Sequence, residues 1–460
     1  MTRPTLPLSL TRRSGTRLTV QLATQVRELV RSGTLPPGTR LPSSRALAAD
    51  LEVARAVVEH AYDQLSAEGW LAARRGAGTY VAAIGLLPAS AVPRGDPGTT
   101  TGPDVPALVR MDTGTPWIDP RNEAGWRRAW REVSAARMPP GYPDPAGIPE
   151  LRAELAAYVS RTRGLSCHPE HVMVTGGTTH GLGLLLGLLG RGSIAVEDPG
   201  YRCAVATAEQ AGWDVVDVPV DAEGIDVGAL GSTPADTRAV YVTPAHQHPL
   251  GTTMSAGRRI ALLAEATRRD ALLAEDDYDS EFRYDVAPLP ALASLDPDRV
   301  VYLGTASKTV HPALRIGWLV ASSDVVTEIA RRRAARHDHP SWPVQRAFLA
   351  MLRDGHVDQL IRSAARVYAR RSRVVTEALG PFGQVGAPPA GMYLTLPLPG
   401  HVAATVRTAC RAVGFDVPSL ADYCRSRELT GLVVGFGGVT DDELSRALEV
   451  MTGALATTVG

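Results

Sequence analysis

Residues 300–320 read VVYLGTASKTVHPALRIGWLV and contain Lys308, the only lysine among the 48 basic residues of the 460-residue chain. The stretch predicts an apolar strand, a turn of small and hydroxyl-bearing residues, and a second apolar run that begins at Arg315. Arginine can replace lysine wherever a charge or a donor is sufficient, but a guanidinium stays protonated and cannot attack a carbonyl. A single lysine in an arginine-rich chain is therefore a candidate for covalent amine chemistry. The alternative is that Lys308 is a solvent-exposed residue that was retained by chance and has no chemical role.

The turn around Lys308 also carries groups suited to an anion. Thr305, Ser307 and Arg315 offer two hydroxyls and a guanidinium to a phosphate. Residues 171–189, HVMVTGGTTHGLGLLLGLL, predict a strand, a glycine-threonine turn and a helix whose first turn presents free backbone N–H groups to an anion. Each piece alone is a weak signal, because a glycine turn before a helix most often only connects two elements.

An acid and a phenol follow another apolar run. In residues 271–284, ALLAEDDYDSEFRY, Asp276 and Tyr278 stand at the end of the predicted strand, where the alternation of side chains puts both on one face. Open α/β sheets bind ligands at the carboxyl ends of their strands. The pair is therefore a candidate for a ligand site, although an acidic pair is most often a helix cap or part of a solvated face.

The composition changes near residue 85, which divides the chain. Residues 85–108 are rich in Pro, Gly, Thr and Ala without apolar periodicity, as is typical of a linker. Residues 109–460 alternate short apolar runs with amphipathic helical patterns, which predicts an α/β domain with a mainly parallel sheet and helices on both faces. Residues 1–84 are expected to form a separate, smaller domain.

Residues 1–84 have the pattern of a helix-turn-helix with a wing. Apolar residues recur at helical spacing in residues 18–30, and two short helices separated by a few residues are predicted in residues 41–70. Two short strands then flank a glycine turn that carries Arg74 and Arg75 at its tip. The first 85 residues hold eleven arginines and six acidic residues although the whole chain has no net charge, so the basic, partner-binding end is N-terminal.

The string LPSSRALAADLEVARAVVEHAYDQLSAEGW, followed by GAGTYV, resembles the winged helix-turn-helix of the GntR family of bacterial regulators. The resemblance implies a double-stranded DNA operator as partner, with Arg45 and Arg55 against bases or phosphates in the major groove. Further DNA contacts are implied for Ser43, Ser44, Arg74, Arg75, Gly76, Gly78 and Thr79. The recognition helix opens with Ala54-Arg55-Ala56 where relatives have a Ser-Arg pair and a polar residue, so Arg55 carries more of the base reading.

The larger domain carries a succession of motifs in the order found in aminotransferases of fold type I, which hold pyridoxal 5'-phosphate (PLP). After the glycine-threonine turn come EDPGY at 197–201, TPAHQHPLG at 243–251, EDDYDSEF at 275–282 and SKTVHPALRIG at 307–317. With the GntR-like head and the linker, the whole chain resembles the MocR subfamily, also called GabR-like regulators. The resemblance implies a homodimer and a smaller C-terminal α/β subdomain.

The resemblance also implies a role for each matching residue. Lys308 would form the internal aldimine with the cofactor aldehyde, Asp276 would pair with the pyridine nitrogen, and Tyr278 would donate to the phenolic oxygen. Tyr201 would stack on the ring, and Tyr142 would reach the phosphate of the neighbouring subunit. The phosphate would be bound by Gly177, Thr178, Thr179, Thr305, Ser307 and Arg315.

Three positions depart from the pattern of working aminotransferases. His248 replaces the asparagine of an NPxG motif, where its imidazole could donate to the cofactor or only pack. Val433 stands where the enzymes present the arginine that clamps the substrate carboxylate, and Arg202 lies one position before an arginine that some relatives use. These losses count against efficient amino-acid turnover, because a charge-assisted contact is missing.

The remaining features narrow the class of protein. The four cysteines are scattered, so neither a disulfide framework nor a zinc site is indicated. No run of about eighteen apolar residues could span a bilayer, and the N-terminus lacks the apolar core of a signal peptide. We therefore expect a cytoplasmic protein with no metal and no membrane partner.

Three functions compete at this point. The leading one is a transcriptional regulator whose PLP domain senses PLP or an amine or amino-acid effector through Lys308 and modulates DNA binding, with control of vitamin B6 metabolism as the preferred subtype. The alternative is a PLP-dependent aminotransferase with an appended DNA-binding head, which the missing carboxylate clamp disfavours. The third is a structural, enzyme-like dimer that holds no cofactor.

Overall fold

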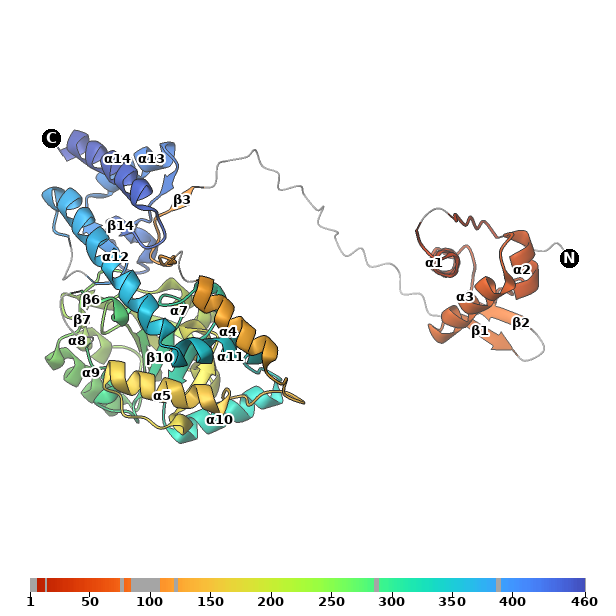
Figure 1. Ribbon diagram of the computed structural model, residues 1–460, viewed down its shortest axis with the longest axis horizontal. Helices are drawn as coiled ribbons and strands as arrows, with labels where there is room; N and C mark the ends of the chain where they lie inside the picture. The colour runs from red at the N-terminus through yellow and green to blue at the C-terminus, as the bar shows by residue number, and fades with distance from the viewer. Residues whose placement is uncertain are drawn as a thin grey trace. The chain divides into compact units, whose positions relative to one another are not determined.

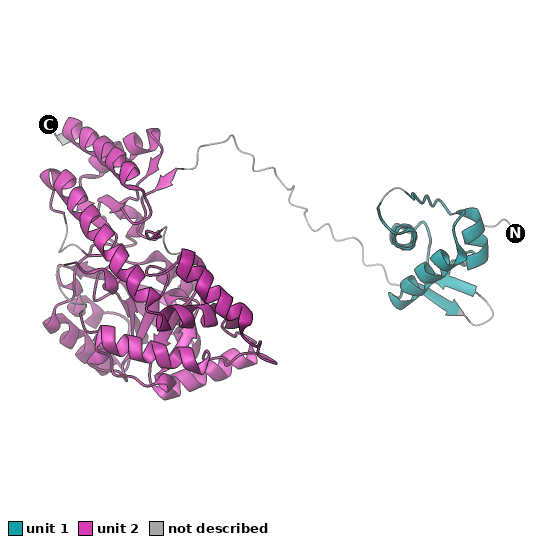
Figure 2. Cartoon of the chain, viewed as in Figure 1, with its two compact units in different colours: residues 1–104 teal, residues 105–460 magenta. Residues whose placement is uncertain are grey.

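The computed structural model describes residues 6–12, 15–74, 78–83, 108–119, 123–284, 289–385 and 390–459. The chain divides into two compact units, residues 1–104 and 105–460 (Figure 2). The predicted linker, residues 85–108, lies outside the described residues except for Leu108.

The N-terminal unit consists of three helices and a two-stranded antiparallel hairpin (Figure 1). Its elements are α1 (Leu18–Arg31), α2 (Ser44–Asp50), α3 (Arg55–Ala67), β1 (Leu71–Arg74) and β2 (Gly78–Val81). Leu22, Val26, Val58 and Leu65 are fully buried, since each lies on the inward stripe of its helix. The short connection between α2 and α3 and the hairpin after α3 confirm the predicted winged helix-turn-helix.

The C-terminal unit is built on an eight-stranded sheet with the strand order β4-β11-β10-β9-β8-β5-β6-β7. The strands are β4 (Val172–Thr175), β5 (Ser193–Asp198), β6 (Asp214–Asp221), β7 (Gly224–Ile225), β8 (Thr237–Val242), β9 (Leu272–Asp277), β10 (Val300–Thr305) and β11 (Gly317–Val320). The pairs from β10 through β9, β8 and β5 to β6 are parallel, which confirms the predicted mainly parallel sheet.

Strand β11 runs against this direction, and the reason lies in its connection. It pairs antiparallel with both β10 and β4, with Thr305 opposite Gly317. Parallel neighbours need a crossover of a dozen or more residues, whereas residues 306–316 contain only the short helix η5 (Pro312–Leu314). This tight return carries Lys308, so both ends of its loop are fixed by paired strands.

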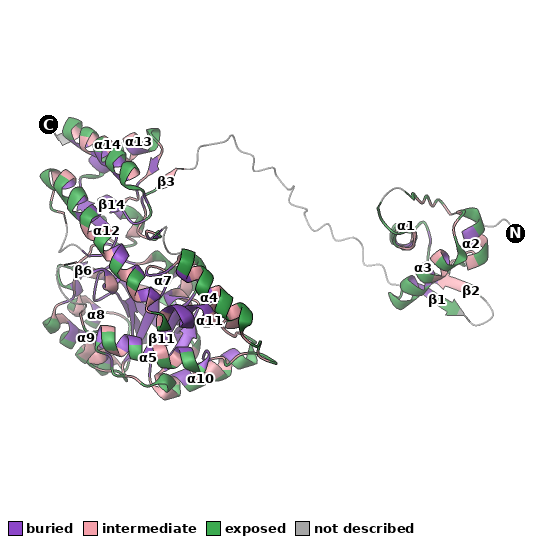
Figure 3. Cartoon of the chain, in the orientation of Figure 1, coloured by how far each residue is buried: buried purple, intermediate pink, exposed green. Residues whose placement is uncertain are grey.

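Helices cover both faces of the sheet, as predicted. One face packs against α5 (Pro149–Arg163), α9 (Ala256–Arg269) and α11 (Trp342–Arg353). The other packs against α6 (Thr178–Leu189), α7 (Arg202–Gln210) and α10 (Ser323–Ala335). In β10, Val300 and Tyr302 join the first core while Val301 and Leu303 join the second, because successive side chains of a strand point to opposite faces. Figure 3 accordingly shows buried strands between helices that are exposed on their outer sides.

The predicted smaller C-terminal α/β subdomain is also present and is called the C-terminal layer below. It contains β12 (Tyr393–Pro397) paired antiparallel with β14 (Gly431–Gly435), and β13 (Phe415–Asp416) paired parallel with β3 (Val109–Arg110). Its helices are α12 (His356–Leu379), α13 (Gly400–Ala412) and α14 (Asp441–Val459). The unit is completed by α4 (Glu123–Ala135), α8 (Val227–Gly231), η2 (Pro169–His171), η3 (Ser280–Phe282), η4 (Leu292–Ser294), η6 (Gly380–Phe382) and η7 (Leu420–Tyr423).

Candidate functional site

A cavity of about 190 Å³ lies at the carboxyl ends of the parallel strands, where open α/β sheets bind ligands. Its lining residues are Thr113, Gly114, Gly177, Thr178, Thr179, Tyr201, Tyr241, Thr243, His248, Asp276, Tyr278, Thr305, Ser307, Lys308, Pro312 and Arg315. Every residue for which the sequence implied a cofactor contact is among them except Tyr142. Tyr241 and the pair Thr113-Gly114 were missed because no motif included their segments, whereas Thr243 and Pro312 stand inside the quoted motifs but were given no role.

Lys308 presents its amine to this cavity from the tight return between β10 and β11. Its Nζ donates to the carbonyl oxygen of Gly114 at 2.6 Å. Burial lowers the pKa of Lys308, since the charged form loses hydration, while Asp112, Asp279 and Asp276 oppose the shift. A lowered pKa makes the neutral, nucleophilic amine more accessible.

Asp276, at the end of β9, offers the cavity an unsatisfied carboxylate oxygen. The residue is buried, its Oδ2 accepts a hydrogen bond from the Tyr241 hydroxyl, and its Oδ1 is buried without a partner among the described residues. Burial raises the pKa of Asp276 to about 7, although the hydroxyls of Tyr241 and Thr178 act in the opposite direction. A buried acceptor of this kind needs a donor or a cation from a ligand.

An anion cradle forms another part of the cavity lining. Helix α6 begins after Gly177, whose φ of +113° is a backbone conformation that favours glycine. The first turn of the helix lines the cavity, so its backbone N–H groups are available to an anion there. A Cβ added at Gly177 would lie 3.5 Å from Nη2 of Arg315, so the guanidinium stands directly over this turn. Thr305 Oγ1 donates to Ser307 Oγ at 3.0 Å, which places two hydroxyls beside it. The combination suits a phosphate.

His248 lines the cavity and is surrounded by four tyrosines, of which Tyr201 and Tyr278 also line it. Its ring centroid is 5.2 to 5.8 Å from those of Tyr201, Tyr278, Tyr393 and Tyr423, all in edge-on contacts. Burial, with Lys308 and His246 adding to the effect, lowers the pKa of His248 to about 3. The imidazole that replaces the usual asparagine is therefore neutral.

The side chains expected near a substrate carboxylate lie elsewhere. Val433 is fully buried in β14, where it pairs with Thr395 inside the C-terminal layer. Arg202 is exposed and donates to the carbonyl of Asp422. Arg315, in the anion cradle, is the only arginine that lines the cavity in the described part of the chain.

Tyr142 lies outside the cavity of its own chain. Its side chain is 74% exposed, and its ring stacks on His339 with centroids 5.1 Å apart. The predicted contact with a neighbouring subunit remains a prediction.

The predicted DNA contacts of the N-terminal unit cluster around the start of α2 and α3. Ser43 caps α2 by accepting from the Ala46 N–H, and Ser44 donates to Glu59. Arg55 is exposed and donates to Oε1 of Glu59 at 2.7 Å, while Arg45 is exposed.

The wing supplies the other predicted DNA contacts. Gly78 and Thr79 begin β2, and a Cβ at Gly78 would lie 3.1 Å from Nε of Arg40. Arg74 ends β1, whereas Arg75 and Gly76 lie outside the described residues.

Two classes of site are absent from the described residues. No group of three or more His, Cys, Asp or Glu side chains there could hold a metal ion. None of the helices described has the length and apolar character needed to cross a membrane.

Comparisons with known proteins match both units. The family described as "Bacterial regulatory proteins, gntR family" matches residues 18–81, and "Aminotransferase class I and II" matches residues 121–436. The pyridoxine biosynthesis transcriptional regulator PdxR of Corynebacterium glutamicum is 35% identical over 98% of this chain and 99% of that protein. The probable rhizopine catabolism regulatory protein MocR of Rhizobium meliloti is 33% identical over 77% of this chain and 75% of that protein.

The larger unit also matches solved enzyme structures. An archaeal alanine:glyoxylate aminotransferase is similar with a TM-score of 0.69 and 25% identity over 76% of this chain and 91% of that one. The fold and the relatives together define a helix-turn-helix transcriptional regulator that carries an aminotransferase domain of fold type I. The chain belongs to the GntR family of bacterial regulators and, within it, to the MocR type.

Proposed function

We propose that the cavity binds PLP covalently through Lys308 and that this binding modulates the affinity of the N-terminal unit for an operator. When bound, PLP supplies an aldehyde for an amine and an electron-withdrawing ring. Lys308 would hold the aldehyde carbon, and the free Oδ1 of Asp276 would accept from the ring nitrogen. The turn at Gly177 and the guanidinium of Arg315 would bind the phosphate.

The observation that carries this proposal is the unsatisfied, buried Oδ1 of Asp276. It lies in the same cavity as the only lysine of the chain and an anion cradle, so the cavity offers one group for each polar feature of PLP. Among the residues that the structure describes, the one arginine lining the cavity belongs to that cradle, which supports PLP itself, rather than an amino acid held by its carboxylate, as the effector. We infer control of vitamin B6 metabolism, which is supported by the Corynebacterium relative, named as a transcriptional regulator of pyridoxine biosynthesis.

Electrophoretic retardation tests this function, with a DNA fragment from the region upstream of the protein's own gene. At moderate salt the full-length protein should retard the fragment, and added PLP should change the apparent Kd, because a ligand shifts an equilibrium only through different affinities for its two states. An identical Kd with PLP, and with a panel of amines, would count against a sensing role.

The assembly proposed for this function is a homodimer acting in the cytoplasm, where a bacterial operator lies. The exposed side chains of Met138 and Tyr142, at 78% and 74%, belong to one short segment and support a subunit contact there. A monomeric mass for the full-length protein in solution would contradict the dimer.

An aminotransferase with a DNA-binding head is the second candidate function. The likeness of the larger unit to an alanine:glyoxylate aminotransferase favours it. Repeated turnover of an amino acid, followed by the absorbance of the bound cofactor, would support catalysis. We expect no more than slow or partial turnover, because an unclamped carboxylate loses a contact in the transition state.

Arg55→Ala is expected to weaken operator binding by about tenfold, since a base or phosphate contact in the major groove is worth about 1–3 kcal/mol. Electrophoretic retardation at fixed salt measures the effect. The matched control is Arg31→Ala in α1, which removes an equally exposed arginine paired with Glu28. An equal loss in the two variants would show that Arg55 contributes only net charge.

A further inference from the structure

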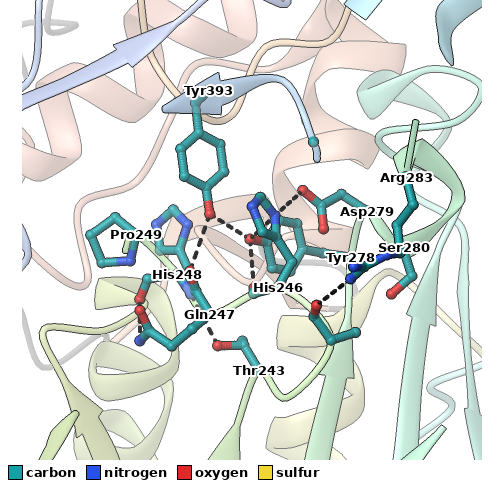
Figure 4. A network of polar contacts seen from close by, with 12 residues as sticks. Thr243, His246, Gln247, His248, Pro249, Tyr278, Asp279, Ser280, Arg283 and Tyr393 are labelled. Carbon is teal, nitrogen blue, oxygen red and sulfur yellow. Dashed lines mark hydrogen bonds and ion pairs between the residues drawn. The ribbon is translucent and has the colours of Figure 1, made fainter. Parts of the chain in front are cut away.

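The hydroxyl of Tyr278 is shared between the cavity and the C-terminal layer. It donates to the carbonyl oxygen of His246 at 3.0 Å and lies 2.7 Å from the hydroxyl of Tyr393 on β12 (Figure 4). Burial raises the pKa of both tyrosines well above the usual range, so both remain neutral phenols. Tyr278 therefore has one proton to donate and more than one acceptor within reach.

Asp279 sets the direction of the hydrogen bonds around His246. The two side chains are almost fully buried, and Nδ1 of His246 lies 2.8 Å from Oδ2 of Asp279. Since a carboxylate only accepts, Nδ1 carries the proton and donates to Asp279. Although Nδ1 is also 3.2 Å from the Tyr278 oxygen, it has no lone pair left for the tyrosine proton.

Gly391, before β12, encloses the His246–Asp279 pair. Its φ is +69°, and an added Cβ would lie 2.5 Å from Oδ2 of Asp279 and 2.6 Å from Cε1 of His246. The backbone can approach the two side chains this closely because glycine has no Cβ. The pair is thereby held in place by the same layer that supplies Tyr393.

Tyr393 is left as the donor to Tyr278. Because Tyr278 gives its own proton to His246, the 2.7 Å contact between the two hydroxyls uses the proton of Tyr393. The other acceptor near Tyr393, the carbonyl of Gln247, is 3.4 Å away and much weaker. A phenol oxygen that accepts a hydrogen bond becomes a stronger donor through its own O–H.

We propose that Tyr393 and the His246–Asp279 pair are positioning residues that prepare the Tyr278 hydroxyl to donate to an oxygen of the bound ligand. The inference rests on the proposed binding of PLP, whose ring carries a phenolic oxygen. When the ligand enters, Tyr278 turns its O–H from the His246 carbonyl to that oxygen, and Tyr393 continues to donate to Tyr278. Only hydrogen bonds are exchanged, and all protons stay on their own oxygens.

The test is a pH titration of the visible absorbance of PLP bound to the full-length protein. A phenolic oxygen that loses a donated hydrogen bond is less stable as an anion, so the midpoint of the absorbance change should rise. We expect Tyr278→Phe to raise the midpoint by about one to two pH units and Tyr393→Phe by about half a unit. In a Tyr278→Phe background, Tyr393→Phe should add no shift, because it acts through Tyr278.

Two more variants complete the test. Asp279→Asn leaves an oxygen acceptor for His246 but adds a donor and removes a charge that raises the pKa of Lys308. Its effect is therefore read as the difference between the wild-type and Tyr278→Phe backgrounds, and the part that acts through Tyr278 should be absent from the second, which keeps the inference testable if Tyr393→Phe does not fold. Tyr423→Phe is the matched control, since Tyr423 contacts the ring of His248 from the same layer and should leave the midpoint in place.

The possible results separate this inference from the proposed function. An unchanged midpoint in Tyr393→Phe, with a shift in Tyr278→Phe, would overturn the positioning role, and so would an Asp279→Asn shift that is the same in the wild-type and Tyr278→Phe backgrounds. An equal Tyr393→Phe shift with and without the Tyr278 hydroxyl would also overturn it. A wild-type protein that gives no absorbance band with PLP would instead contradict the proposed cofactor binding.

Discussion

Lys308→Arg is expected to abolish covalent attachment of PLP while the protein still folds. Arginine keeps the positive charge and can still donate to the Gly114 carbonyl, but its guanidinium is not a nucleophile at any pH that the protein tolerates. Borohydride reduction followed by intact mass measurement reads the result. The wild-type chain should gain one pyridoxyl group and the variant none.

The composition of the chain makes this measurement decisive. Because Lys308 is the only lysine, no second lysine can capture the aldehyde, and the N-terminal amine is the one other candidate. Operator binding without PLP should be unchanged in the variant, and its response to PLP should be lost. A phosphopyridoxyl mass that maps to the N-terminal peptide in the wild-type chain, or that is not confined to that peptide in the variant, would disprove the assignment of Lys308.

Asp276→Asn is expected to stabilise the ligand-free protein at pH 8 and to weaken PLP binding by about a hundredfold or more. The pKa of Asp276 is raised from 3.8 to about 7 in the folded protein, so the folded state binds the proton more tightly than the unfolded state does. The free energy of unfolding therefore falls as the pH rises from about 4 to about 7. A shift of about three pKa units corresponds to a cost on the order of 4 kcal/mol above pH 7, which the amide does not incur.

In the presence of PLP, the same substitution is expected to be unfavourable. A bound PLP would offer Oδ1 of Asp276 a ring nitrogen, whose positive charge in the protonated form would compensate the ionised carboxylate, whereas an amide carries no charge to pair with it. Chemical denaturation at pH 5 and pH 8, together with PLP titration at pH 8, measures both quantities.

Glu197→Gln is the matched control for Asp276→Asn. The pKa of Glu197 is likewise raised to about 7 by burial, but the residue does not line the cavity. It should share the stabilisation at pH 8 and leave PLP affinity unchanged. Equal PLP affinity in wild type and Asp276→Asn would rule out the proposed role of Asp276.

Local motifs were sufficient to predict most of the cavity because each was a strand followed by a turn. Asp276, Lys308 and Gly177 each follow an apolar run, and the carboxyl ends of parallel strands meet at one edge of a sheet. The antiparallel β11 was not foreseen, since the length of the return after β10 becomes informative only once the strand ends are known.

The residues that sequence reasoning missed contribute through pairing between distant segments. Tyr241 reaches Asp276 because β8 and β9 are neighbours, and Tyr393 reaches Tyr278 from more than a hundred residues away. Single tyrosines in apolar strands look like core residues, so nothing in a one-dimensional pattern marks their hydroxyls as part of a site.

The hydrogen bond from Lys308 to Gly114 joins the cavity to a turn near the beginning of the C-terminal unit. Gly114 follows closely on the predicted linker, and the Asp112 carboxylate braces the same turn by accepting from the N–H groups of Gly114 and Thr115 at 2.8 Å. A ligand that binds the Lys308 amine would compete with the Gly114 carbonyl for the same nitrogen. We therefore expect the turn at residues 112–115 to be held most firmly when the cavity is empty and to gain freedom when a ligand binds the amine.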